Sequence, residues 1–261
     1  MRTERTTGRD RVERALVAAG CLAPAEEASA LLSAAVDGVG PIDELVRRRS
    51  DGEPLAWITG WTTFLGVRVG VDRHVFVPRP HSELLARVAV ALLPERGLAV
   101  DLCTGCGAIA VALGAARPSA TIVATDADPA AVANARRNGV DARVGDLDEP
   151  LASIRSTVDV VTAVTPYVPT DDLRFLPRDV LENEPVGALD GGPRGTDVAW
   201  RAVEAAARLL RPGGAVVLEI GGDQAAELTE ALAAAGFGSI EVHRDDEGQD
   251  RAVAGTFERH G

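Results

Sequence analysis

The segment 99–107 has the residue types and spacing that, within this chain, are most typical of a site that binds a ligand. An apolar run ends in an acid, Asp101, which is followed by a turn containing Gly105 and Gly107 and then by a helical pattern. Glycine has no Cβ, so backbone N–H groups in such a turn can approach a ligand closely. The pattern predicts a strand, a tight turn and a helix around a nucleotide-type cofactor. Because Gly105-x-Gly107-x-x-Ala110 also fits a dinucleotide fingerprint, later residues must decide which cofactor is bound.

Two further acids follow at positions that suit a nucleoside. Asp126 ends the second apolar run, about twenty residues past the glycine turn, where a carboxylate can accept hydrogen bonds from both ribose hydroxyls. Asp128 and Pro129 are better placed than Asp126 to begin the next helix, which leaves Asp126 free for the ribose. Asp146 follows Gly145, where an acid can accept the exocyclic amine of adenine, although such an Asp alone is typical of a turn.

Cys103 and Cys106 form a C-x-x-C pattern, which could indicate redox or zinc chemistry. A structural zinc site needs four ligands, and His74 and His81 lie far back in the sequence. We therefore interpret both cysteines as small loop residues, open to oxidation, and expect no metal.

A fourth apolar run ends at Val164-Thr165-Pro166-Tyr167, and Tyr167 is the only tyrosine of the chain. In a doubly wound sheet the strand after the topological switch ends above the cofactor cleft. There Pro166 would fix the backbone, and Tyr167 would offer a flat wall to a planar group. The alternative is a loop aromatic that only packs on the sheet.

The elements that must position these residues follow from the hydrophobic spacing. Three short helices are predicted within 9–50, a β-hairpin within 57–77 and a helix over 82–93. After Pro94, strands and helices alternate, which predicts an α/β fold with a parallel, doubly wound sheet. The predicted strands are 98–103, 120–125, 142–144, 158–164, 214–220, 238–243 and 251–257, and the helices are 107–116, 129–138, 197–211 and 223–235. The last two strands are too close for a helical crossover, so they should pair antiparallel.

Composition limits the classes of protein that remain. The net charge of −12 argues against a non-specific nucleic-acid binder, so we expect no nucleic-acid partner. No apolar stretch approaches the ~20 residues of a membrane span, and the first residues lack the apolar segment of a secretory signal. The 3 cysteines form no disulfide framework. These features predict a cytoplasmic protein, and nothing indicates its oligomeric state.

Taken in order, these motifs resemble the protein-glutamine N5-methyltransferases that modify peptide-chain release factors. The resemblance covers nearly the whole chain and rests on the segments 53–60, 64–66, 77–80, 101–107, 184–185, 188–192 and 218–221, together with Asp126 and Asp146. It implies a seven-stranded class I methyltransferase fold and S-adenosylmethionine as cofactor. It also implies a helical substrate-recognition domain over 1–55, a β-hairpin linker over 56–80 and a cofactor-binding domain over 81–261.

The resemblance implies a role for each matching residue. The cofactor would contact Asp101, Cys103, Thr104, Gly105, Gly107, Ile109, Asp126, Ala127, Gly145, Asp146 and Leu147. The substrate would contact Pro78, Arg79, Pro80, His81, Glu184 and Pro185. Val164, Thr165, Pro166 and Tyr167 would carry the catalytic groups.

The chain departs from the family at the catalytic motif. The family has Asn-Pro-Pro-Tyr where this chain has Val164-Thr165-Pro166-Tyr167. In the family, the Asn side chain and the next backbone carbonyl accept the two amide hydrogens of the substrate glutamine. Val164 has no acceptor, and losing one such contact costs on the order of 10²–10³ in rate. A second departure is His81-Ser82, where the family usually has Glu-Thr.

Two hypotheses follow. In the first, the chain is an active S-adenosylmethionine-dependent methyltransferase that modifies a glutamine amide, or another nitrogen or oxygen nucleophile, on a release factor-like protein or a small molecule. An amine that is already nucleophilic would not need the missing Asn. In the second, the chain binds the cofactor but has lost glutamine methylation and serves a binding role or different chemistry. The persistence of the cofactor loop, Asp126, Pro166 and Tyr167 favours the first hypothesis.

Overall fold

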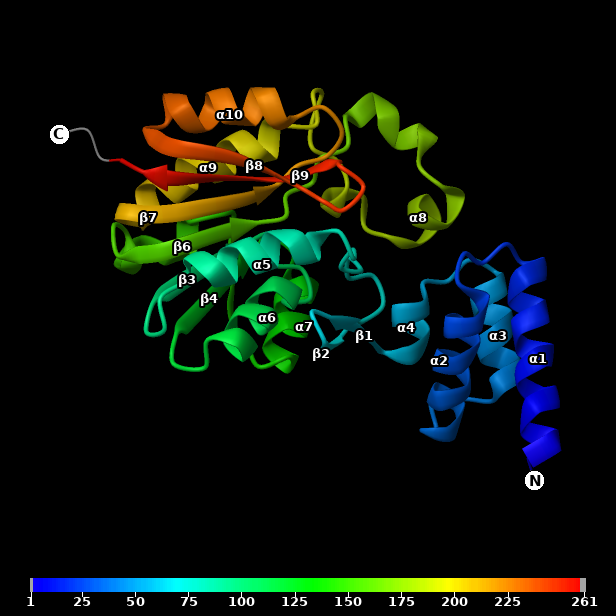
Figure 1. Ribbon diagram of the computed structural model, residues 1–261. Coiled ribbons are helices and arrows are strands. Elements are labelled where there is room, and N and C mark those ends of the chain that lie inside the picture. The colour runs from blue at the N-terminus through cyan, green and yellow to red at the C-terminus, as the bar shows by residue number, and fades with distance from the viewer. Residues whose placement is uncertain (1, 259–261) are drawn as a thin grey trace.

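The computed structural model describes residues 2–258, with the side chains of 8–177 and 180–258. Its main feature is a seven-stranded sheet in the order β5-β4-β3-β6-β7-β9-β8 (Figure 1). The strands are β3 (Leu98–Leu102), β4 (Thr121–Asp126), β5 (Asp141–Val144), β6 (Val158–Ala163), β7 (Leu210–Glu219), β8 (Phe237–Arg244) and β9 (Asp250–Phe257). The first five are parallel, and β9 pairs antiparallel with both β7 and β8, which confirms the predicted sheet.

Helices cover both faces of the sheet, as a doubly wound fold requires (Figure 1). The helices α5 (Ser82–Leu92), α6 (Ala108–Ala116) and α7 (Pro129–Arg137) lie on one face, and α9 (Asp197–Leu209) and α10 (Ala225–Ala234) lie on the other. Each face has its own aliphatic core. Leu85, Leu113 and Val217 belong to the core under α5 and α6, whereas Leu209 and Leu218 belong to the core under α9 and α10.

The N-terminal part forms a separate cluster of helices beside the sheet (Figure 1). The helices α1 (Arg2–Ala18), α2 (Pro24–Val36) and α3 (Ile42–Ser50) confirm the three predicted there. They share a small core with Leu16, Leu31 and Leu45, all fully buried.

The predicted hairpin over 57–77 is shorter than expected. Its first residues belong to α4 (Leu55–Thr59), because Pro54 starts a helical turn and Gly60, at φ 80°, ends it. The antiparallel strands are β1 (Trp61–Phe64) and β2 (Val67–Gly70), and the chain from 71 to 77 is a loop. Val71 and Val75 of that loop are buried in the core, and Val77 packs against it, although none of the three belongs to a strand.

The connection from β6 to α9 contains short helices that no periodicity predicted. It holds η2 (Thr170–Phe175), α8 (Arg178–Asn183) and η3 (Val186–Ala188), and a further short helix, η1 (Glu149–Ile154), follows β5. At the far end of this connection α9 ends at Leu209 and β7 begins at Leu210, so the helix predicted to 211 is two residues too long.

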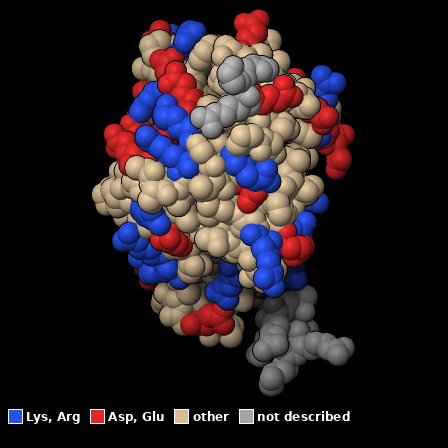
Figure 2. Space-filling view, turned by 90° about the vertical axis from the view of Figure 1, so that its left-hand side faces the viewer, with Lys and Arg blue, Asp and Glu red and all other residues tan. Residues whose placement is uncertain are grey.

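The surface mixes charges of both signs. On the face seen in Figure 2, acidic and basic side chains alternate. Pairs such as Arg211 with Asp159 and Arg244 with Asp250 illustrate how opposite charges meet on the sheet surface. Within residues 2–258, no helix combines the length and the apolar character needed to cross a membrane.

Candidate active site

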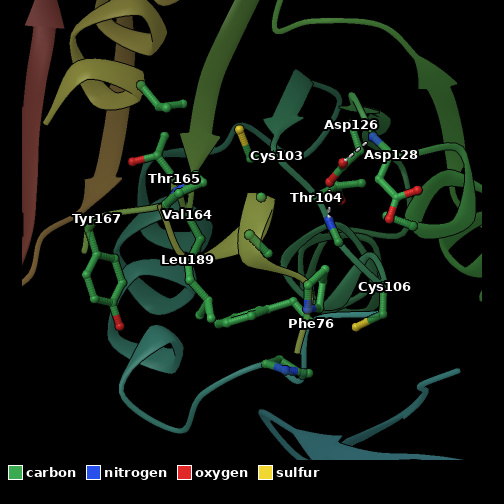
Figure 3. A pocket seen from close by; sticks show the side chains of 18 of the residues that line it. Phe76, Cys103, Thr104, Cys106, Asp126, Asp128, Val164, Thr165, Tyr167 and Leu189 are labelled. Atoms are coloured by element: carbon green, nitrogen blue, oxygen red, sulfur yellow. Dashed lines mark hydrogen bonds between the residues drawn. The ribbon is translucent and has the colours of Figure 1, made fainter. Parts of the chain in front are cut away.

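A cavity of about 740 Å³ opens at the carboxyl ends of β3, β4 and β6 (Figure 3). Parallel strands end at the same edge of a sheet, and ligands of open α/β folds bind there. Most of the predicted site residues line this cavity: Pro78, Arg79, Asp101, Cys103, Thr104, Gly105, Ile109, Asp126, Ala127, Asp146, Val164, Thr165, Pro166, Tyr167 and Pro185. The sequence motifs therefore converge in one place.

Asp101 is the buried anchor of the glycine turn. Its two carboxylate oxygens accept hydrogen bonds from the hydroxyls of Thr104, at 2.5 Å, and Thr162, at 2.7 Å. Burial raises the pKa of Asp101 to about 6, against the lowering effect of these two bonds. Thr104 comes from the turn and Thr162 from β6, so Asp101 ties the turn to the neighbouring strand.

The turn itself needs left-handed backbone. Cys103, Gly105 and Gly107 have φ values of 54°, 57° and 86°. No heavy atom lies within 4 Å of the position that a Cβ on Gly105 would take, so this glycine leaves its side open. A Cβ on Gly107 would lie 3.1 Å from Ala135, so this glycine allows α6 to approach α7 and does not line the cavity.

Both cysteines of the C-x-x-C pattern are held as neutral thiols. Burial raises the pKa of Cys106 to about 12 and raises that of Cys103 further still. Only a thiolate is a good metal ligand or nucleophile. Without a metal, neither thiol is therefore activated as a nucleophile, which fits the interpretation of both cysteines as small loop residues.

Asp126 faces the cavity and also holds the turn in shape. Its Oδ2 accepts the Gly105 N–H at 2.8 Å, and its Oδ1 accepts the Asp128 N–H at 2.9 Å (Figure 3). Burial raises the pKa of Asp126. Asp128 caps α7 by accepting the Ala130 N–H at 2.8 Å, with Pro129 in the first turn, which confirms that prediction.

Asp146 lies at the rim of the cavity and forms an ion pair with Arg201 of α9. Arg201 was not predicted, because no motif marks it and 55 residues separate the two. Gly145 and Leu147, which flank Asp146 in the sequence, do not line the cavity. A Cβ on Gly145 would lie 2.7 Å from the ring of Pro150, and Leu147 is buried in the core under α9.

The other end of the cavity has apolar walls. Val164, Thr165 and Tyr167 come from the end of β6, and they face Phe76 and Leu189, which come from two distant loops (Figure 3). Further apolar wall residues that were not predicted as site residues are Phe64, Leu176, Val180, Ala188 and Val198, of which Phe64 and Ala188 lie in segments that carry the family resemblance. Aromatic residues are only 3% of this chain, so Phe76, which lies just before the predicted site residue Pro78, was recognisable in the sequence as a candidate site residue.

Tyr167 stands against the end of β7. A Cβ on Gly221 would come within 2.8 Å of the Tyr167 ring, so only a glycine lets the ring lie there. Burial, followed by the negative charge of Glu219, raises the pKa of the phenol. The hydroxyl therefore remains protonated at neutral pH.

A second cavity of about 590 Å³ lies between the N-terminal helices and the site, and shares Pro78, Arg79 and Val180 with the first. At the junction, Arg79 donates to both carboxylate oxygens of Glu184, at 2.7 and 2.8 Å, and its guanidinium stands 4.7 Å from the centre of the Phe76 ring. Of the predicted substrate residues, Pro80 and Glu184 line only this second cavity.

His81 lines neither cavity. It lies at the start of α5, where its Nε2 is 3.4 Å from Oε1 of Glu219 at the end of β7.

The chain is similar to known proteins over most of its length. A family model described as "Methyltransferase small domain" matches residues 80–166. The release factor glutamine methyltransferase of Geobacter sulfurreducens is 38% identical over 219 residues, which are 82% of this chain and 76% of the relative. The 4-amino-L-phenylalanine/4-methylamino-L-phenylalanine methyltransferase of Streptomyces pristinaespiralis is 39% identical over 202 residues, 73% of this chain and 69% of the relative.

A solved structure shares the fold. The 16S rRNA N2 G1207 methyltransferase of T. thermophilus, in complex with AdoMet and guanosine, superimposes with a TM-score of 0.53 at 23% identity. The match covers 76% of this chain and 50% of that one. This similarity bears on the fold, which is that of class I methyltransferases.

Proposed function

Since this chain belongs to the release factor glutamine methyltransferase family and is an S-adenosylmethionine-dependent methyltransferase, we propose that its methyl acceptor is an amine, and specifically an arylamine, rather than the side-chain amide of glutamine. Val164, at the position of the family's catalytic Asn, is the observation that carries this proposal.

The cavity suits the cofactor. The open side of Gly105 leaves room for a ligand against the backbone, and Asp126 and Asp146 supply carboxylate acceptors for ribose hydroxyls and an adenine amine. Arg201, now paired with Asp146, would lie over that end of the ligand. When bound, S-adenosylmethionine supplies a methyl group on a positively charged sulfur.

A carboxamide is a poor acceptor without help from the protein. Its nitrogen lone pair is delocalised into the carbonyl, so two well-placed acceptors are needed to orient the NH₂ group and support charge growing on nitrogen. Val164 removes the side-chain acceptor and leaves the carbonyl of Thr165. An arylamine needs less help, because its lone pair is only partly delocalised into the ring and stays far more available than that of an amide.

The apolar walls favour an aromatic acceptor. Phe76, Tyr167 and Leu189 can enclose a flat ring, and aromatic rings gain from packing on one another. An arylamine is unprotonated at neutral pH, whereas an alkyl amine resembles Lys, with a pKa near ~10.4, and must first lose a proton. The relative from Streptomyces pristinaespiralis is named for an arylamine substrate, which supports the same choice.

A methyl-transfer assay with labelled S-adenosylmethionine tests the proposal. The acceptors are 4-aminophenylalanine, a peptide with a single glutamine and an intact release factor, with phenylalanine as the control that lacks the aryl nitrogen. We expect kcat/KM for the arylamine to exceed that for the glutamine peptide by about a hundredfold, the size of effect that one catalytic acceptor supplies.

The opposite order of rates would contradict the proposal and assign the chain the glutamine acceptor of its family. Retention of Pro166 and Tyr167, which stand as in the family motif, is the observation that favours that second candidate. Tight cofactor binding without transfer to any of these acceptors would instead support the hypothesis of a binding protein.

A further inference from the structure

Glu219, the last residue of β7, has a carboxylate that no described residue satisfies. Its exposed fraction is 2%, and neither oxygen has a hydrogen-bond partner within the part of the chain that the structure describes. Burying an ionised carboxylate without hydrogen bonds is costly, and such groups in native proteins call for an explanation.

The sheet register brings Glu219 next to the altered catalytic position. Ala163 pairs with Leu218 in parallel, so Val164 and Glu219 stand at the same level on neighbouring strands, about 4.8 Å apart at the backbone. Side chains alternate along a strand, and Val217, two residues before Glu219, lies in the core under α5. Val164 packs against that same core. The two side chains therefore share one face, with Glu219 behind the cavity wall.

Glu219 also has no guanidinium partner in the described structure. The ionisable group that the described structure places beside it is the His81 imidazole, whose Nε2 lies 3.4 Å from Oε1 of Glu219. Arg79 and Arg251, which act on the same Tyr167 phenol as Glu219 does, donate hydrogen bonds to other carboxylates. Among the described residues, no arginine is therefore placed to pair with the Glu219 carboxylate.

A second unsatisfied polar atom lies in the same region. Ser82 follows His81 at the start of α5, lines the cavity and is only 3% exposed. Its hydroxyl has no hydrogen-bond partner among the described residues. Two buried polar groups around His81 thus lack partners, at the side of the cavity where the acceptor would enter beside Val164.

Methylation of an amine moves a positive charge. The nitrogen lone pair forms the new N–C bond while the C–S bond breaks, the sulfur keeps that electron pair, and the nitrogen carries the charge until a proton leaves to water.

We propose that Glu219 stabilises this charge through space, from behind Val164. The proposal rests on the proposed function, because an acceptor nitrogen must reach the cavity beside Val164. A carboxylate behind an apolar wall is less screened than one in water, so its attraction for the developing cation is stronger.

Glu219→Gln tests this role, since it removes the charge and keeps the shape. We expect kcat for the arylamine to fall about tenfold or more, with little change in the KM for S-adenosylmethionine. The midpoint of thermal unfolding should rise, because an unpaired buried charge is removed. Glu241→Gln, the same change at an exposed position of β8, is the control and should alter neither value. An unchanged kcat, or a lower unfolding midpoint as expected of a purely structural residue, would overturn the proposal.

A binding experiment gives a readout that needs no acceptor. Sinefungin is a cofactor analogue that carries a primary ammonium group in place of the methyl sulfonium, and S-adenosylhomocysteine is uncharged at the corresponding sulfur. Calorimetry should find that the wild-type protein prefers sinefungin, and that Glu219→Gln reduces this preference about tenfold. The same preference in both proteins would overturn the role of Glu219 even if the wild type methylates arylamines. If no amine is methylated but the preference is lost in the variant, the proposed acceptor is wrong and the role of Glu219 stands.

Discussion

Val164→Asn should move the acceptor preference from arylamine toward glutamine. The change places a side-chain carbonyl beside the Thr165 carbonyl, and the new amide N–H₂ stands level with the unsatisfied carboxylate of Glu219, which can orient it. One catalytic acceptor is worth on the order of 10²–10³ in rate, or about 3–4 kcal/mol. Desolvation of the new amide offsets part of this gain, about 1–2 kcal/mol, which leaves an expected rise of about tenfold or more in kcat/KM for the glutamine peptide.

The same substitution carries a stability cost that can be measured. Val164 is half-buried against the core under α5, so its replacement by a polar side chain should cost about 1 kcal/mol, or roughly 2–4 °C in unfolding midpoint for a chain of this size. The arylamine should lose about tenfold in kcat/KM, since a polar group now stands in the apolar wall.

The assay compares the two acceptors on one enzyme preparation, with cofactor affinity measured in parallel. Val164→Thr is the matched control, because it keeps the branched shape and adds a hydroxyl but no amide. The reasoning is refuted if Val164→Asn binds the cofactor normally and yet leaves the ratio of the two rates unchanged. Position 164 would then not decide between amide and amine.

Three further outcomes follow from the site. Asp126→Asn should weaken S-adenosylmethionine binding about tenfold or more, as measured by calorimetry. The reason is that the charged acceptor for the N–H groups of the glycine turn and for the ribose hydroxyls of the ligand is lost. Unaltered affinity would contradict the ribose role. Gly221→Ala should lower kcat, because its Cβ would come 2.8 Å from the Tyr167 ring. The control is Gly222→Ala, whose Cβ would have no atom within 4 Å and should cost only backbone strain. Equal kinetics in the two variants would show that the position of the Tyr167 ring does not matter. The pKa of Asp101 is raised from 3.8 to about 6 in the folded protein, so the folded state holds this proton more tightly than the unfolded state. The free energy of unfolding should therefore fall as pH rises from about 4 to 6. Thermal unfolding of Asp101→Asn at the same pH values should lack this fall, and parallel pH profiles of the two proteins would contradict the reasoning.

The cofactor end of the site was predictable because its information is local. Asp101, the glycine turn and Asp126 lie within one strand–turn–helix–strand unit, and their spacing alone places them at one edge of a parallel sheet. The acceptor end was not predictable in the same way. Phe76 and Leu189 come from loops without periodicity, and only the folded chain brings them opposite Val164.

Two other residues escaped sequence reasoning for separate physical reasons. Arg201 looks like any exposed arginine of an amphipathic helix, and its pairing with Asp146 depends on how α9 packs across the sheet. Glu219 was visible as part of a family signature, but its lack of a partner depends on the side chains of three elements at once. An unsatisfied group is a property of packing, and no motif reports it.

The two cavities adjoin at Arg79, which lines both and is paired with Glu184 of the second. The first cavity is bounded by strand ends and by loop residues such as Phe76 and Leu189, whereas the second is also lined by residues of α2, α3 and α4. On the proposed function, exchange of one wall residue of the first cavity, such as Val164, changes which nucleophile reacts and leaves the second cavity unaltered. In such a layout, few substitutions in the first cavity are needed for a protein that modifies a macromolecule to become one that modifies a metabolite.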